Sequence, residues 1–278
     1  MKQILLICAA VVLLGCAKKV LEQQANVPAT NPPAQPPAKE PKQPPAKPKV
    51  EPTEATLTPG MKAAKKAHEA GNYREAARLY TVELAAEEAK PAPSWVQLSY
   101  LHNQLGLALD NAGLYDKALE HYQKSLATGL KQLGPEHPDV AMSYNNIGAV
   151  YDNKGEYDKA LEHYQKALAI QLKQLGPEHP EVATSYNNIG GVHRKKGDND
   201  KALEHYQKSL AIVIKQLGPE HPHVATCYYE MAYVYKAKKD LAKAKEYWEK
   251  AYVIRLKTLG PNHPRTKNAK AELDALKE

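Results

Sequence analysis

The fold of this chain is decided by residues 138–180, which read PDVAMSYNNIGAVYDNKGEYDKALEHYQKALAIQLKQLGPEHP. The stretch is one unit of an internal repeat, because a Leu-Gly-Pro-(Glu/Asn)-His-Pro motif recurs every 42 residues. The motif begins at Leu133, Leu175, Leu217 and Leu259. A fixed period of roughly 20 to 50 residues is typical of repeat arrays, in which each unit buries its apolar face only against its neighbours.

Each unit is predicted to consist of two antiparallel helices. Pro138 suits a first helical turn, where its missing N–H would have no partner, and Asp139 places a negative charge at the positive end of the helix dipole. Apolar residues follow at the helical spacings of three and four, at Val140, Ala141, Tyr144, Ile147, Gly148 and Tyr151. Gly155 ends this helix, and a second helix from Tyr157 closes at Gly176, which we expect to form a left-handed cap.

Columns of small and large residues, one period apart, predict how the helices pack. The small residues are Gly106, Gly148, Gly190 and Ala232 on the first helix, and Ala76, Ala118, Ala160, Ala202 and Ala244 on the second. A column of rings consists of Tyr80, Tyr122, Tyr164, Tyr206 and Trp248. We expect the small residues to let the two helices approach closely and the rings to fill the space beside them.

This pattern resembles the tetratricopeptide repeat (TPR). The residues that carry the resemblance are Gly148, Tyr151, Gly155, Tyr157, Ala160, Tyr164 and Ala167, and the 42-residue period with its connecting motif is similar to the long TPR of kinesin light chains. The resemblance runs from about Leu57 to the C-terminus. It implies an all-α fold, a right-handed superhelical solenoid of helix-turn-helix repeats. A HEAT or armadillo array has a similar period but does not predict the spacing from Gly148 to Ala167.

The chain is predicted to have three parts. Residues 1–15 are a signal peptide, residues 16–57 a lipidated cysteine with a disordered Pro/Lys-rich linker, and residues 58–278 the TPR array. The repeats are expected at about 57–98, 99–140, 141–182, 183–224 and 225–266, with a capping helix at 264–277. The linker composition favours extended polyproline II, and therefore a stalk.

The N-terminus predicts a lipid anchor. The apolar run from Ile4 to Leu14 is 11 residues long, which is too short to span a layer of ~30 Å but suits the core of a signal peptide. The LLGC sequence that ends at Cys16 resembles the bacterial lipoprotein box, which implies cleavage before Cys16 and attachment of acyl chains to it. Ala17 in the next position goes, in the enterobacterial lipoproteins that this resembles, with sorting to the outer membrane, facing the periplasm. The alternative is an ordinary secretory signal with a chance cysteine.

Composition argues against nucleic-acid binding and catalysis. The chain of 278 residues has a net charge of +7, but its Lys and Arg residues are interspersed with Glu and Asp, and no aromatic-basic motif for bases is present. The sequence contains no Gly-rich phosphate loop, no His-Glu-x-x-His and no Gly-x-Ser-x-Gly. We therefore expect no enzyme activity, no catalytic residue, no cofactor and no small-molecule substrate.

Histidine and cysteine are assigned structural roles. The histidines form two columns, His137, His179, His221 and His263, and His121, His163 and His205. Stacked helices lie about 10 Å apart, whereas zinc needs its donors within ~2.1 Å of one ion, so we expect no metal site. The His-Pro pairs are instead predicted to cap the following helix. Cys227 is predicted to be a small buried residue without a disulfide partner.

A groove is the predicted functional site. In the TPR fold the first helix of each pair lines the concave face, and the predicted groove residues are Asn103, Asn145, Asn146, Asn187, Asn188, Arg194, Lys195, Tyr229, Tyr233 and Lys236. A row of amides can bind an extended peptide backbone without reading its sequence, because each amide carries a donor and an acceptor. The alternative is that these amides are only solvated. A neighbouring column changes from Asp110 and Asp152 to Arg194 and Lys236, which predicts that the acidic end of a partner lies near the cations.

The sequence thus predicts a membrane-anchored scaffold that binds another protein or peptide. An extended peptide and an amphipathic helix both fit this prediction. One alternative is a pilotin-like accessory for secretin or pilus assembly in the outer membrane. A second alternative is a regulator that activates a cell-wall enzyme by contact.

Overall fold

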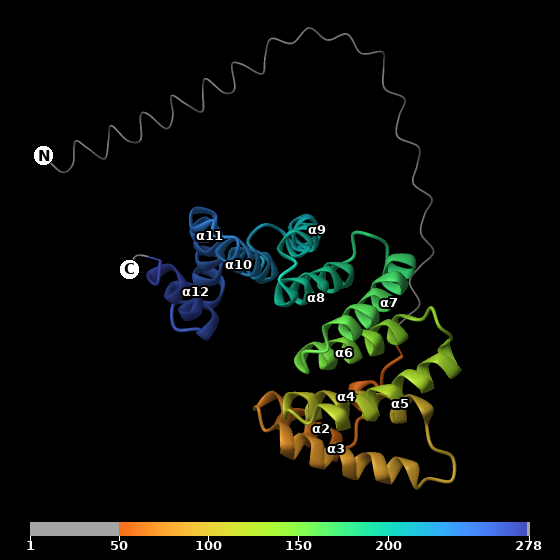
Figure 1. Ribbon diagram of the computed structural model, residues 1–278. Helices are drawn as coiled ribbons and strands as arrows, with labels where there is room; N and C mark the ends of the chain where they lie inside the picture. The colour runs from red at the N-terminus through yellow and green to blue at the C-terminus, as the bar shows by residue number, and fades with distance from the viewer. Residues whose placement is uncertain (1–49, 277–278) are drawn as a thin grey trace, which may run out of the picture. The chain divides into compact units, whose positions relative to one another are not determined.

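The computed structural model describes residues 50–276 as a succession of helices (Figure 1). The A helices are α2 (Pro59–Glu69), α4 (Trp95–Asn111), α6 (Pro138–Asn153), α8 (Pro180–Lys196) and α10 (Pro222–Ala237). The B helices that follow them are α3 (Tyr73–Glu88), α5 (Tyr115–Leu133), α7 (Tyr157–Leu175), α9 (Asn199–Leu217) and α11 (Leu241–Leu259). A 3-10 turn, η1 (Glu54–Thr56), precedes them, and α12 (Pro264–Asp274) follows.

The predicted all-α array of helix pairs is confirmed. Each A helix packs against the B helix that follows it, each B helix packs against the next A helix, and α12 covers α11 as a capping helix. The predicted repeat boundaries fall a few residues inside the A helices. From α6 onward, each A helix begins earlier, at the proline of the connecting motif. Between residues 50 and 276 no helix has the length and apolar character needed to cross a bilayer. The predicted signal peptide, Cys16 and most of the predicted linker lie outside the described residues.

The His-Pro pairs cap the helices, as the sequence predicts. The backbone N–H of Asp139 donates to His137 Nδ1 at 3.2 Å, which gives one of the free N–H groups of the first turn a partner. His179, His221 and His263 accept the equivalent bonds in α8, α10 and α12. The histidine column therefore has a structural explanation that needs no metal.

The glycine of the connecting motif differs from the predicted left-handed cap. Gly176 has φ 84° and ψ 163°, an extended conformation at positive φ that is open only to glycine. The motif keeps this glycine because the chain must turn sharply before the next A helix. Lys239 has φ 62° and takes the place that Gly155 and Gly197 occupy in earlier repeats, where a non-glycine residue costs roughly 1–2 kcal/mol.

Close packing inside each helix pair confirms the predicted small-and-large columns. A Cβ added to Gly148 would lie 2.9 Å from Cδ1 of Tyr164, so the ring lies directly against the backbone of α6. Gly106 and Gly190 meet the rings of the next B helix at the same distance. The ring residues of the column are at most 3% exposed. Burial of each such side chain stabilises the fold by roughly 1.5–3 kcal/mol.

Charged residues that recur on the surface link each repeat to the next. Lys154 near the end of α6 pairs with Asp116 at the start of α5 at 2.6 Å, and Lys196 pairs with Asp158 at 2.5 Å in the next repeat. A second set of pairs joins the last turn of a B helix to the preceding connecting motif, at Lys173–Glu136, Lys215–Glu178 and Lys257–Glu220. Exposed pairs contribute at most about 1 kcal/mol each, but each repeat makes the same contacts to both neighbours.

Candidate binding groove

Side chains of consecutive A helices are hydrogen-bonded to each other. Asn146 Nδ2 donates to Asn103 Oδ1 at 2.8 Å between α4 and α6, and Asn188 Nδ2 donates to Asn145 Oδ1 at 3.0 Å between α6 and α8. Further along the same helices, Asn153 Nδ2 donates to Asp110 Oδ1 at 3.0 Å. The structure thus brings together most of the predicted amide row, but in bonds within the chain.

These bonds leave the amides some binding capacity. An asparagine side chain has two N–H donors and an oxygen with two lone pairs, and each bond between A helices uses only part of this set. Asn103 is 9% exposed, so little of it faces solvent, whereas Asn145, Asn146 and Asn188 are half-buried. The amide row therefore links consecutive A helices, and its role in binding a partner stays a prediction.

The charged column that was predicted to orient a partner is paired within the chain. Lys195 lies 2.8 Å from Asp152, the Arg194 guanidinium lies 3.3 Å from Glu230, and Lys236 lies 3.2 Å from Glu272 of α12. Each predicted cation therefore already has a carboxylate partner. The charged residues of this column therefore form ion pairs between helices. Other charged residues would have to orient a partner.

The two predicted tyrosines belong to the same C-terminal network. The hydroxyls of Tyr229 and Tyr233 are 2.9 Å apart, and Tyr233 donates to Glu272 Oε1 at 2.8 Å. Burial is the first cause that raises the pKa of the Tyr233 phenol, so this phenol stays a hydrogen-bond donor at neutral pH. The network fastens α12 to α10.

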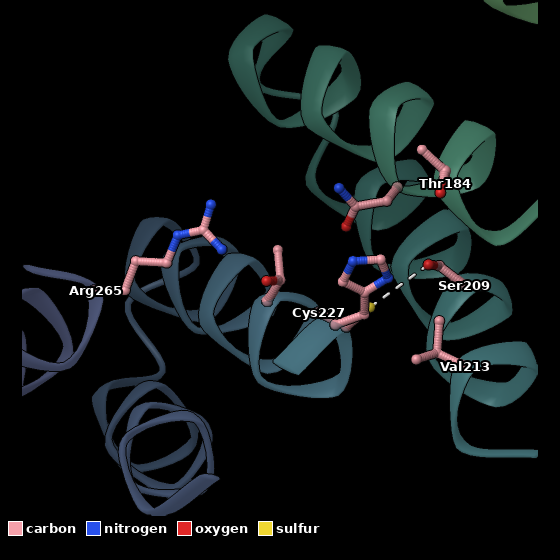
Figure 2. Close-up of a pocket in the computed structure, with 8 residues that line it drawn as sticks. Thr184, Ser209, Val213, Cys227 and Arg265 are labelled. Carbon is pink, nitrogen blue, oxygen red and sulfur yellow. Dashed lines mark hydrogen bonds between the residues drawn. The ribbon is translucent and has the colours of Figure 1, made fainter. Parts of the chain in front are cut away.

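Two of the places where consecutive A helices meet over a B helix, here called joints, contain a pocket. The α4/α6 pocket includes Asn103 of α4 and Ser125 of α5, and the α8/α10 pocket includes Asn187 and Ser209 at the positions 84 residues later. The floor of the α8/α10 pocket is shown in Figure 2, where Ser209 lies beside Cys227 at an Oγ–Sγ distance of 3.5 Å. The two pockets are thus copies of one site, separated by two periods.

One column of buried B-helix residues lies at the joints. The length of the side chain in this column determines whether a joint contains a pocket. The column consists of Glu87, Gly129, Gln171, Val213 and Arg255. The long members bond inside their joints: Ser185 Oγ donates to Gln171 Oε1 at 2.6 Å, and Arg255 donates to the carbonyl oxygen of Arg265 at 3.1 Å. Glu87 accepts from the backbone N–H of Ser94 at 2.8 Å. The short residues at 129 and 213 leave the two pockets.

A segment of the chain itself occupies the α4/α6 pocket. Val50 and Glu51, which are not helical, are among the residues that line it, and the backbone N–H of Val50 donates to Asp139 Oδ2 at 2.9 Å. The remaining cavity there is only about 20 Å³, against about 210 Å³ in the α8/α10 pocket. Sequence reasoning missed this site, although the alternation of short and long residues at 42-residue spacing was its signal.

The α8/α10 pocket differs from its copy in charge. His223 stands at the position of Asp139, and partial burial, followed by the neighbouring His221 and Arg265, lowers its pKa, so the imidazole is neutral at pH 7. Arg265, which reaches toward the pocket from α12 (Figure 2), supplies its positive charge. At the floor, burial raises the pKa of the Cys227 thiol, which keeps it protonated and confirms the predicted buried cysteine.

Two histidines form a close pair between α4 and α5. Nδ1 of His102 on α4 and Nδ1 of His121 on α5 are 3.0 Å apart. Burial, together with the neighbouring His121 and Lys124, lowers the pKa of His102 to about 4. In residues 50–276 no three His, Cys, Asp or Glu side chains are grouped as a metal site would require.

Comparisons with known proteins agree with the repeat geometry. A family model described as tetratricopeptide repeat matches residues 97–173, 153–213 and 181–252. Among solved structures, BtubC (BKLC) from P. vanneervenii is 26% identical with a TM-score of 0.61, over 72% of this chain and 80% of that chain. A Podosopora anserina putative kinesin light chain with nearly identical TPR-like repeats matches in two structures, at 26% and 27% identity and TM-scores of 0.61 and 0.59, over 72% of this chain and 94% of that chain. No curated protein sequence matches significantly.

Proposed function

The chain belongs to the tetratricopeptide-repeat family, and from this membership we propose that it is a membrane-anchored scaffold that binds a segment of another protein along its A helices. The scaffold acts at the outer membrane, on the periplasmic side, where the lipid on Cys16 holds it. The partner enters the groove as an extended peptide. TPR arrays generally mediate protein–protein interaction, and hydrogen bonds between asparagines of α4, α6 and α8 give these helices a shared polar face for it.

One observation carries the proposal. A non-helical segment of the chain, at Val50 and Glu51, already lies in a joint between A helices, and the backbone N–H of Val50 donates to Asp139. A backbone N–H is common to all peptides except those at proline, so the same contact is available to a segment of another protein. The occupied joint supports an extended peptide over a helix, because the segment that fills it is not helical.

Loss of groove amides is expected to weaken partner capture. Asn145→Ala combined with Asn187→Ala removes two side chains that each offer about 0.5–1.5 kcal/mol in a net hydrogen bond, so retention of the partner should fall roughly tenfold. The measurement is pull-down with the purified chain, followed by mass spectrometry. Gln165→Ala with Gln207→Ala removes two exposed amides from the B helices of the same repeats and is the matched control. Unchanged capture by the asparagine double variant would overturn the proposed groove.

Removal of the proposed lipid site is expected to release the chain from membranes. Two or three acyl chains hold a soluble domain far more firmly than one chain, so Cys16→Ala should move the protein from the membrane fraction to the soluble fraction. Cys8→Ala is the control, because Cys8 lies in the proposed signal peptide. Retention of the Cys16 variant in the membrane fraction would contradict lipid anchoring.

The same variant separates the scaffold from its alternatives. The pilotin-like accessory must carry its client to the outer membrane, so the client should be mislocalised when Cys16 is replaced. A contact regulator of a cell-wall enzyme should lose activation in cells but keep binding in solution. A plain scaffold should still bind its partner in the soluble fraction.

A further inference from the structure

The α8/α10 pocket is a larger copy of a pocket that the chain lines with its own residues Val50 and Glu51. In the α4/α6 pocket, Val50 and Glu51 leave about 20 Å³, and the equivalent space between α8 and α10 is about 210 Å³. The joint between them is closed, because Gln171 stands in the floor column and bonds Ser185. Val213 at the same column position is too short to close the α8/α10 joint. The chain thus provides both an occupied and a closed reference for this pocket.

An acceptor in the pocket has no donor among the described residues. Asn103 and Asn145 accept from the asparagine 43 residues later, but Glu230 stands at that position for Asn187. A carboxylate cannot donate at neutral pH, and Glu230 is paired with Arg194 instead. Asn187 Oδ1 is therefore buried without a hydrogen bond inside residues 50–276 and can accept from a donor on a ligand. The backbone N–H of an extended ligand is such a donor.

The charge of the pocket determines which side chains the bound backbone can carry. Asp139 beside the occupied pocket accepts from Val50, whereas its counterpart His223 is neutral and lies beside the Arg265 guanidinium. The Arg265 side chain lines the pocket and supplies a fixed positive charge there. A guanidinium binds a carboxylate through two parallel N–H donors. The stretch of chain beside Val50 carries Lys47 and Lys49 and is therefore a poor fit here.

We propose that the α8/α10 pocket binds an extended acidic segment of a partner protein, with a backbone N–H on Asn187 and an Asp or Glu carboxylate on Arg265. The inference rests on the proposed scaffold function and adds the chemistry of the partner. Cys227 and Ser209 form the floor, so the side chain that enters must be small or flexible. The α4/α6 pocket remains the place of the chain's own segment.

The test uses two capped hexapeptides and the full purified chain. The acidic probe is Pro-Glu-Val-Glu-Pro-Thr, and the neutral probe is Pro-Lys-Val-Glu-Pro-Thr, which is the sequence of residues 48–53. Methyl NMR reads each pocket separately, because Thr226 lines the α8/α10 pocket and Met142 occupies the equivalent position in the α4/α6 pocket. We expect the acidic probe to shift the Thr226 methyl signal in a saturable way, with an affinity about tenfold above that of the neutral probe.

Variants locate the contact. Arg265→Ala should weaken the acidic probe about tenfold, while Lys267→Ala, which removes another exposed cation of α12, should leave it unchanged. Val213→Gln should abolish binding, because Gln171 shows that this side chain closes a joint, and Gly129→Gln should close only the α4/α6 pocket. A thermal melt checks that both glutamine variants fold. If Val213→Gln does not fold, the comparison of Arg265→Ala with Lys267→Ala tests the proposed contact instead.

Three results would overturn the inference. They are a shift at Met142 instead of Thr226, equal affinity for the two probes, and no saturable shift with either probe. Each of these outcomes leaves the proposed scaffold function standing if the chain still captures a protein through its amide row. Because Asn187 belongs to both sites, Asn145→Ala alone tests the amide row and Arg265→Ala tests the pocket. Loss of partner capture in the first variant, with probe binding unchanged, keeps the two proposals separate.

Discussion

Tyr164→Ala is expected to lower the free energy of unfolding by about 3–5 kcal/mol. The ring is 3% exposed and lies against the backbone of Gly148, where no side chain is available to move into the space that it leaves. In a repeat array each unit is stabilised by its neighbours, so a cavity in the third repeat also weakens the coupling between the two halves. Urea denaturation followed by circular dichroism should show a lower midpoint and a broader transition.

Tyr164→Phe is the matched variant for this prediction. It keeps the ring and removes only the hydroxyl, so it should cost no more than about 1 kcal/mol. Tyr80, Tyr122 and Tyr206 occupy the same position in other repeats and should repeat the result. Equal destabilisation by the alanine and phenylalanine variants would show that the hydroxyl, and not ring packing, stabilises the helix pair.

His102→Tyr is expected to remove much of the loss of stability in acid. Burial lowers the pKa of folded His102 to about 4 from an ordinary value of 6.5, so between these pH values the unfolded chain binds more protons than the folded chain. Stability therefore falls as pH decreases from about 6.5 to about 4 and is not reduced further by this residue below that range. At about 1.4 kcal/mol for each pH unit between the two pKa values, the loss approaches roughly 3 kcal/mol. Urea denaturation at a series of pH values measures it.

The chain supplies the design and the control for this variant. Tyr144 and Tyr186 stand at the position of His102 in the next two repeats and face His163 and His205 across the helix pair. A tyrosine therefore fits there. The reverse change, Tyr144→His, should create a new histidine pair with His163 and add acid sensitivity. A pH profile of His102→Tyr that matches the unmodified chain would assign the acid sensitivity to His121, His163 and His205, whose pKa values burial also lowers.

Features that belong to a single unit could be predicted from the sequence. The helix that begins at Pro138, the histidine cap at His137 and the contact of Gly148 with Tyr164 all depend on residues close together in one repeat. Local propensity, capping and helical period act over that range, so the 42-residue pattern was sufficient. Cys227 was also predicted correctly, because its place on the apolar stripe of α10 implies burial.

Features that arise between units could not be predicted in the same way. The amide row looked free because the bond from Asn146 to Asn103 joins side chains on different helices of neighbouring repeats. The cation Lys195 looked available for the same reason, and it is paired with Asp152. The relative placement of neighbouring A helices decides these contacts, and periodicity gives their order but not their distances. Gly176 was predicted in the wrong region of positive φ, because composition shows that glycine is needed without showing which ψ it adopts.

The lysine and carboxylate pairs between neighbouring repeats make each 42-residue unit interchangeable with the next. Lys154 reaches back to Asp116, and Lys196 reaches back to Asp158 in the same way, so an extra copy inserted between them would meet matching partners on both sides. Unequal recombination in the coding sequence could therefore lengthen or shorten this protein by whole units while the ion pairs between neighbouring repeats stayed intact. Such length variants would differ in how many joints lie between α2 and α12, and so in the length of surface that they offer to a partner.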